Sequence, residues 1–494
     1  MTKKNKLLLL SALCLTLNGC SAMQKLSQKH NPQNTVSNTK IADKWQASLP
    51  HGGSQANLAQ FWQQFDDALL LELIAAAQTE SATLASAKAR IAQARAKRVQ
   101  TDAALLPAVD GSASASRSVQ QPATSVQGNG VQGGGSSAYN NAKVDVQASW
   151  ELDIFGVNHA ARDANLAQEH AAQANWHDAR VAVAAELANA YFSQRFCEKQ
   201  LNILEADAKS RAESLRLTEI TVAAGFSAPA SAHLARASMA DAAQQIKAQL
   251  AQCDLDVKAL VALTGLDESA LREKLKSQSF NPNNNALNSL FSMSEVPAQI
   301  ITQRPDINAA EADLISAATD IRSTYAESLP KVSLNGSIGW MRLSGSNFSS
   351  NGKTWSLGPI SITFPIFHPG VAEAGLASAE ANYEDKAATY RSKVRYAVKE
   401  VEDALVNLHS ANTRQADISE AVKNYQASFS ATETKVKAGF ANLIELEEQR
   451  RSLLLTETTA LNNLKQRTLA WVSLYRAAGG GWNKKVLAET GNSK

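Results

Sequence analysis

Two patterns of apolar residues alternate along the chain. Val144, Val146 and Trp150 are separated by polar residues, and this period of two predicts a strand with one apolar and one polar face. Segment 157–224 instead carries Ala, Leu and Val at heptad-like spacing, which predicts a long helix that packs against other helices. The chain is therefore expected to combine short sheets with very long helices.

The same pattern occurs twice. Residues 84–107 align without a gap on 307–330, and three glycines recur at one constant offset, with Gly156, Gly225 and Gly265 matching Gly370, Gly439 and Gly479. Such a constant offset indicates an internal repeat. The predicted segments are 1–19, 20–67, a first repeat 68–265, a connecting segment 266–300, a second repeat 301–482 and a tail 483–494.

Each repeat begins with a predicted helix that ends before Pro107 or Pro330. A predicted β-hairpin follows it, at 108–155 and at 331–369. Glycine- and serine-rich stretches, 128–135 and 344–353, are predicted loops, and Gly358-Pro359 predicts a bulge. Four strands cannot close a barrel, and lipid tolerates no open sheet edge, so other chains must complete a membrane barrel. A small soluble β module is the alternative.

A helical hairpin follows each pair of strands. The first runs over 157–224 and 227–264 with a turn at Gly225, and the second over 371–438 and 441–478 with a turn at Gly439. The longer helices would span about 100 Å. Rods of this length have no globular core of their own, so the expected fold is a membrane β-barrel joined to a long α-helical coiled-coil barrel.

The N-terminus looks like an export signal. Lys3, Lys4 and Lys6 precede an apolar run that ends at Cys20 in the sequence Leu-Asn-Gly-Cys, which resembles the lipobox of bacterial lipoproteins. The resemblance implies cleavage before Cys20 and acylation of its thiol and new amino group. Ser21 after the cysteine favours the outer membrane, and several acyl chains on one residue would anchor stably.

Charge adds one correction to this picture. The 494 residues hold 49 basic and 46 acidic groups, but the predicted signal contains three of the lysines and no acid. The mature chain is therefore formally neutral, which excludes the basic surface of a nucleic-acid-binding protein. The four cysteines of the full sequence are too few for a disulfide-dense scaffold.

Several motifs together resemble one family, the TolC-type outer membrane efflux channels, and in particular the NodT-like lipoproteins of resistance-nodulation-division (RND) systems. The motifs span nearly the whole mature chain: Trp62-x-x-Phe65-Asp66-Asp67, Ala87-x-x-Arg90-Ile91-x-x-Ala94-Arg95, Ser149-Trp150-Glu151-Leu152-Asp153-Ile154-Phe155-Gly156, Arg304-Pro305-Asp306-Ile307, Phe364-Pro365-Ile366-Phe367 and Leu474-Tyr475-x-Ala477-x-Gly479-Gly480-Gly481-Trp482.

This resemblance implies a homotrimer with a barrel of about 12 strands in the outer membrane and a tunnel of about 12 helices in the periplasm. It implies a passive exit duct for drugs or other toxic small molecules, with a periplasmic adaptor and an inner-membrane RND transporter as partners. Apart from the lipid on Cys20, no cofactor is implied. A duct for type I protein secretion and a non-conducting coiled-coil scaffold are the alternatives.

The resemblance also assigns site residues. Gly225 and Gly439 would form the periplasmic tips that contact the adaptor, together with Phe226, Lys435 and Phe440. Leu443 and Glu447 match the position of a closed periplasmic gate, where threefold symmetry would gather three carboxylates. A solvent-exposed face on which the acids pair with Arg450 and Arg451 is the alternative.

Two further cysteines, Cys197 and Cys253, lie at equal distances along the chain on either side of Gly225. An antiparallel hairpin folded at this glycine brings them level, and the periplasm permits a disulfide. Helix axes about 8–10 Å apart leave the required Cα separation marginal, so two buried thiols are the alternative.

Catalytic and metal-binding motifs are not found in the sequence. The eight histidines show no HExxH or other paired ligand spacing, and the chain has neither a P-loop nor a Gly-x-Ser-x-Gly elbow. We therefore expect no enzyme and no metal site, and any energy for transport would come from a partner. The exported substrates cannot be read from the sequence.

Overall fold

The computed structural model describes residues 21–41, 45–47, 61–120, 137–278, 280, 297–345, 348–363, 365–367 and 369–482. The predicted signal peptide, Cys20, the loop 128–135, the tail 483–494 and part of the connecting segment 266–300 lie outside these residues. The described chain forms two compact units. The first contains residues 21–38, 90–172 and 310–390, and the second contains the described parts of 39–89, 173–309 and 391–482.

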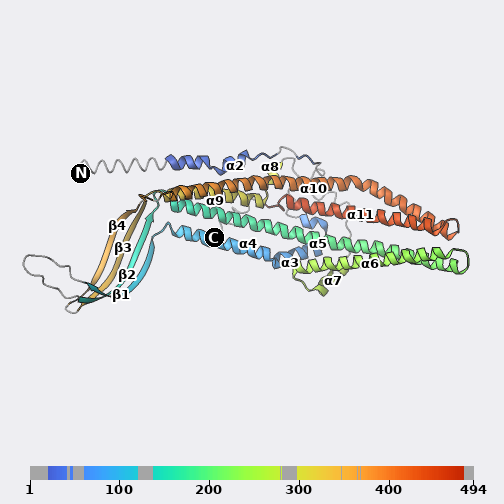
Figure 1. Cartoon of the computed structure of the whole chain (residues 1–494), viewed down its shortest axis with the longest axis horizontal. Helices are drawn as coiled ribbons and strands as arrows, with labels where there is room; N and C mark the ends of the chain where they lie inside the picture. The colour runs from blue at the N-terminus through green and yellow to red at the C-terminus, as the bar shows by residue number, and fades with distance from the viewer. Residues whose placement is uncertain are drawn as a thin grey trace, which may run out of the picture. The chain divides into compact units, whose positions relative to one another are not determined.

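A four-stranded antiparallel sheet lies in the first unit, with β1 (Ala108–Gln120), β2 (Ser137–Leu152), β3 (Lys331–Gly345) and β4 (Ser349–Thr363) side by side in this order (Figure 1). The two predicted hairpins are therefore joined through the pairing of β2 with β3. Within the described residues, β1 and β4 each pair on one side only.

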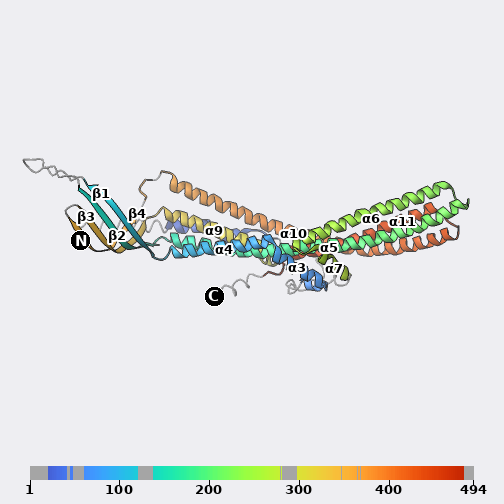
Figure 2. The same ribbon diagram turned by 90° about the horizontal axis from the view of Figure 1, so that it is seen from below.

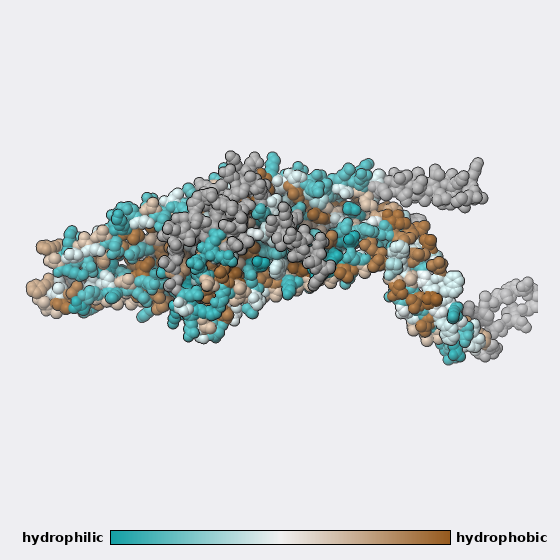
Figure 3. All heavy atoms as spheres, turned by 180° about the vertical axis from the view of Figure 1, so that it is seen from behind, coloured by the Kyte–Doolittle hydropathy of each residue, from teal (hydrophilic) through white to brown (hydrophobic). Residues whose placement is uncertain are grey.

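One face of the sheet is apolar. Val146 of β2 lies opposite Ile338 of β3, which lies opposite Trp355 of β4, and their exposed fractions are 47%, 66% and 77%. Figure 3 shows hydrophobic residues gathered over the visible part of the sheet. The predicted alternation is thus confirmed, and so is the bulge, because the register between β3 and β4 shifts opposite Gly358-Pro359.

The opposite face of the sheet is polar and holds a buried acid. Asp145 is 3% exposed and accepts hydrogen bonds from Ser112 at 2.8 Å, Lys143 at 3.1 Å and Gln147 at 2.6 Å. A Cβ on Gly339 would come within 2.5 Å of the Asp145 Cβ, so only glycine fits beside it. The carboxylate is therefore fully bonded within the sheet.

The second strand pair is longer than the sequence suggests. Residues 344–353 are predicted as a loop, yet β3 continues to Gly345 and β4 begins at Ser349. The Gly345 amide donates to the Phe348 carbonyl at 2.8 Å. Ladder hydrogen bonds use backbone groups alone, so a stretch of Ser, Asn and Gly pairs once its neighbour sets the register.

Helices of the first unit pack on an apolar core and bind the N-terminal segment. Leu314 and Ile321 of α9 (Pro305–Glu327) pack with Tyr383 of α10 (Val371–Lys437). Thr35 of α2 (Pro32–Asn38) hydrogen-bonds to the Tyr383 hydroxyl at 3.1 Å, and Lys29 pairs with Glu380 at 3.1 Å. The segment after the predicted lipidation site therefore lies along α10.

Two antiparallel helical hairpins dominate the second unit (Figures 1 and 2). α5 (Val157–Ala223) returns as α6 (Pro229–Thr264), and α10 returns as α11 (Leu443–Ala477). These bounds confirm the predicted helices to within one or two residues. The glycines that recur in the sequence share one backbone geometry, since φ is 80° at both Gly225 and Gly439, a left-handed value that glycine adopts without strain.

The structure also contains α3 (Ala68–Glu80), α4 (Ala82–Ala103), α7 (Glu268–Ser277) and α8 (Pro297–Thr302). Of these, α3 and α7 contact α6. The Phe61 ring stacks on Tyr475 with centroids 4.7 Å apart. Asp67 caps α3 by accepting from the Leu70 amide, and its other oxygen accepts from the Tyr191 hydroxyl at 2.6 Å.

Buried Arg304 joins three further elements. Its Nε and Nη2 hold Asp306 at 2.9 Å each, Nη2 also pairs with Glu400 at 2.7 Å, and Nη1 donates to the Ala477 carbonyl at 2.9 Å. A Cβ on Gly479 would lie 2.9 Å from the Gln303 carbonyl oxygen. The Arg-Pro-Asp motif and the glycines after α11 therefore form one packed junction.

Within the described residues, no single helix is both long and apolar enough to cross a membrane. The pair α3 and α4, bent by 50° at their junction, meets that length and composition only when taken together.

Candidate functional site

Both hairpins end in the same turn. The Phe226 amide donates to the Thr221 carbonyl at 2.9 Å, and the Phe440 amide donates to the Lys435 carbonyl at 2.8 Å. Together with glycine in the left-handed region, this hydrogen bond is the pattern of a Schellman cap. The phenylalanines point away from the fold, with exposed fractions of 87% and 85%, so each tip presents one uncovered aromatic ring.

The tips differ in charge. Lys435 is exposed beside the second tip, and Lys437 pairs there with Glu433 at 3.4 Å. Thr221, which occupies the position equivalent to Lys435 in the first hairpin, is neutral and donates its hydroxyl to the Thr218 carbonyl. A partner that binds both tips therefore meets a cation at only one of them.

Glu447 lies inside the protomer near the second tip. Its side chain is 7% exposed and forms an ion pair with Arg450, one turn further along α11. Oε2 accepts from the Ser238 hydroxyl of α6 at 2.8 Å and lies 3.6 Å from Nη1 of Arg211 on α5. The Glu447 carboxylate therefore connects α11 with both α5 and α6.

Other members of the same group complete the connection. Arg450 donates to the Ser214 hydroxyl at 2.7 Å and the Ser210 hydroxyl at 3.0 Å. Arg211 donates to Asp207 at 2.7 Å and to the Ser238 hydroxyl at 2.6 Å. Burial raises the pKa of Asp207, which the hydrogen bond from Arg211 opposes. We call this set the inter-hairpin cluster: Asp207, Ser210, Arg211, Ser214, Ser238, Glu447 and Arg450.

This placement corrects the sequence-based assignment of Glu447. A carboxylate held by two guanidinium groups inside the protomer does not face an aperture, and Leu443 beside it is only half-buried. The alternative, a solvent-exposed acid paired with Arg450, is right about the pair and wrong about the exposure. The exposed side chains here include Ile444, which is 65% exposed, Glu445 and Glu448.

The sequence does contain a signal for the cluster, in the form of two charged residues at positions of α11 that would normally be apolar. Glu447 and Arg450 fall on the buried stripe of α11 between Leu446 and Leu453, where a coiled coil normally places apolar residues. Charges in such a stripe are costly unless they are paired. Their partners on α5 and α6 belong to the other repeat, so only the folded structure identifies them.

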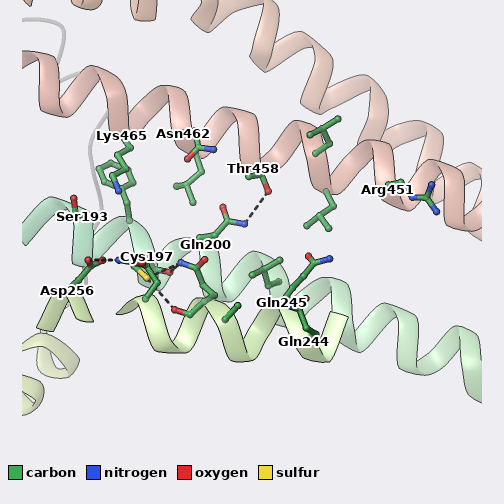
Figure 4. A pocket seen from close by; sticks show the side chains of 18 residues that line it. Ser193, Cys197, Gln200, Gln244, Gln245, Asp256, Arg451, Thr458, Asn462 and Lys465 are labelled. Carbon is green, nitrogen blue, oxygen red and sulfur yellow. Dashed lines mark hydrogen bonds between the residues drawn. The ribbon is translucent and has the colours of Figure 1, made fainter. Parts of the chain in front are cut away.

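Cys197 and Cys253 form a disulfide between α5 and α6, with their Cα atoms 5.5 Å apart. The helices therefore approach closely enough at this level for the geometry that a disulfide needs. The bond borders a groove of about 880 Å³ between α5, α6 and α11 (Figure 4). Side chains that line the groove include Phe196, Gln200, Gln249, Gln252, Thr458 and Lys465.

Side-chain amides connect the helices that line the groove. Gln200 of α5 donates to the Thr458 hydroxyl of α11 at 3.1 Å, and Gln249 donates to the sulfur of Cys197 at 2.9 Å (Figure 4). Among the described residues, no group of three or more His, Cys, Asp or Glu side chains could hold a metal ion.

Comparisons with known proteins cover both repeats. The model of the family described as outer membrane efflux protein matches residues 73–266 and 296–480. The outer membrane protein OprJ of Pseudomonas aeruginosa is 28% identical over 482 residues, which are 96% of this chain and 95% of OprJ. The solvent efflux pump outer membrane protein SrpC of Pseudomonas putida is 28% identical over 485 residues, 95% of this chain and 97% of SrpC. The solved outer-membrane channel OprN aligns with a TM-score of 0.78 and 26% identity, over 90% of this chain and 98% of that one.

Alkylation tests the disulfide. We expect Cys197 and Cys253 to be unreactive toward iodoacetamide in the denatured protein and to take up two labels after reduction, as intact mass shows. Replacing both with alanine should lower the free energy of unfolding by about 4 kcal/mol, because the bond closes a chain separation of 56 residues. Two thiols that react without reductant would contradict the bond.

Proposed function

The chain belongs to the outer membrane efflux protein family, and on this premise we propose that it is the outer membrane channel of an efflux pump, a passive exit duct for toxic small molecules. The observation that carries the proposal is the sheet. It exposes Ile338, Trp355 and Leu357 on one face by 66% or more and carries polar residues on the other. Such a surface suits lipid on one side and water on the other.

Three copies would complete this channel. Within the described residues, β1 and β4 have one free edge each, and lipid forbids unpaired backbone groups. Joining β4 of one copy to β1 of the next closes a barrel of about 12 strands, within the range of outer-membrane barrels. The four long helical segments of each copy would then contribute to one tunnel in the periplasm.

The hairpin tips are proposed as the surface that binds a periplasmic adaptor, which in turn would join an inner-membrane transporter of the RND class. The exposed rings of Phe226 and Phe440 are the apolar anchors that such an interface uses. Lys435 adds a cation at the second tip, which favours an acidic group on the adaptor at that position.

Acylation of Cys20 is the proposed membrane anchor. Its support is the resemblance of residues 1–20 to a lipoprotein signal and the docking of the segment that follows. Lys29 pairs with Glu380 of α10, and the ring of His30 packs against the ring of Tyr383 with centroids 5.2 Å apart. A lipid on Cys20 would therefore be attached a few residues from a segment bound to the helices.

For the periplasmic gate we propose a latch inside each protomer. The inter-hairpin cluster holds α11 against α5 and α6, so separation of the two hairpins would take Glu447 away from Arg211 and Ser238. Removing one partner of a buried ion pair typically costs about 3–5 kcal/mol. Ile444 and Glu448, which are exposed nearby, are the side chains proposed to face the aperture.

Planar-bilayer recording tests channel and latch together. Purified wild-type trimers are expected to conduct weakly, and Glu447→Gln should raise the conductance several-fold because the neutral side chain no longer holds the arginines. Glu420→Gln is the matched control. This exposed acid of α10 bonds to Asn424 on its own helix, and its replacement should leave the conductance within about twofold. Absence of current in every variant would refute the channel, whereas equal currents in wild type and Glu447→Gln would refute only the latch.

A photo-crosslinking amino acid tests the tips. Placed at position 440 in living cells, it is expected to form an adduct with a periplasmic adaptor, which mass spectrometry identifies. The same probe at Phe348, an exposed aromatic at the β3–β4 turn, serves as the control and should form none. Identical adducts at both positions would argue against docking at the tips.

Metabolic labelling with an alkyne fatty acid tests the anchor. We expect the label on the wild type and its loss in Cys20→Ser, while Cys197→Ser keeps it. A label that persists in Cys20→Ser would place the acyl group elsewhere.

A further inference from the structure

One buried arginine of the second hairpin lacks the acceptors that buried guanidinium groups need. Arg467 of α11 is 2% exposed, and its Nε and Nη2 atoms are buried without a hydrogen bond to the described residues. Within the part of the chain that the structure describes, no carboxylate forms an ion pair with it. Burial also lowers the pKa of this guanidinium. An ion in this position is among the most costly groups a protein can bury.

The other buried arginines show how the fold normally compensates such a charge. Arg195, also 2% exposed, donates to the Tyr191 hydroxyl at 3.0 Å and the Leu275 carbonyl at 2.7 Å. Arg304 uses Nε and Nη2 to hold Asp306. In Arg467 the same two atoms have no acceptor among the described residues. They form the edge of the guanidinium group that best binds a carboxylate.

The internal repeat gives the position a counterpart. Ala411 and Arg467 lie at equal distances along the chain on either side of Gly439, and Cys197 and Cys253 lie at that same distance from Gly225. The second hairpin brings its two residues level, because the Asn463 amide, one turn before Arg467, donates to the Ala411 carbonyl at 3.0 Å. At one and the same level, the first hairpin is cross-linked and the second contains a buried arginine whose Nε and Nη2 have no acceptor among the described residues.

We propose that Arg467 weakens the contact between α10 and α11 at this level, so that the second hairpin opens locally while the disulfide keeps the first one closed. Local opening lets the guanidinium regain solvent, and its free energy falls by the cost of burying the unpaired charge. The inference concerns the stability of the hairpins and does not depend on conduction or on the proposed function.

Hydrogen exchange of the full-length trimer in detergent tests this inference. Peptides from 404–415 and 460–471 are expected to exchange at least tenfold faster than those from 190–201 and 249–260. Arg467→Leu, which fills a similar volume without charge, should slow exchange in the first two peptides about tenfold and raise the Tm by several degrees.

Arg195→Leu is the matched control, an equally buried arginine that is fully engaged with neighbouring groups. It should accelerate exchange around 190–201 and lower the Tm, since it strands the groups that Arg195 now bonds. Faster exchange or a lower Tm in Arg467→Leu would overturn the proposal, because it would show that a neighbouring subunit or a bound anion compensates the charge in the trimer. Unchanged exchange in Arg467→Leu would overturn it as well.

Discussion

Backbone hydrogen bonding at the two edges of the sheet is the constraint on which the rest of the protein depends. Among the described residues, β1 and β4 each have one edge that the protomer does not pair, and the apolar face between them is uncovered. In lipid such edges must be closed by another chain. Assembly is therefore a condition of the fold.

Paired charges join the helices of the second unit at several points. The inter-hairpin cluster links α5, α6 and α11, Arg195 links α5 to the end of α7, and Arg304 links the start of α9 to α10 and α11. Contacts of this type depend strongly on geometry, since a displaced partner leaves a buried charge unpaired. They favour a few discrete arrangements over continuous sliding.

Duplication repeated the backbone of the protomer but not its side chains. Turn glycines, helix lengths and cap hydrogen bonds agree between the repeats, with φ of 80° at both tips. The pair Cys197–Cys253 and its counterpart Ala411–Arg467 differ completely in chemistry. Glycine conformations and strand periods are set by the backbone, whereas the side chains between them were free to diverge, so the two hairpins of one chain acquired different strengths.

The sequence by itself determined the repeat, the strand alternation, the helix ends at Gly225 and Gly439, and the pairing level of Cys197 and Cys253, because each of these follows from a local period or from a count along one hairpin. Only the tertiary structure decided which charges meet. The family resemblance places Glu447 at an aperture, yet Ser238 and Arg211 hold it inside the protomer. Spacing along a helix gives the direction of a side chain only relative to its own helix, and the helices packed around it decide whether that direction leads to water or to a partner.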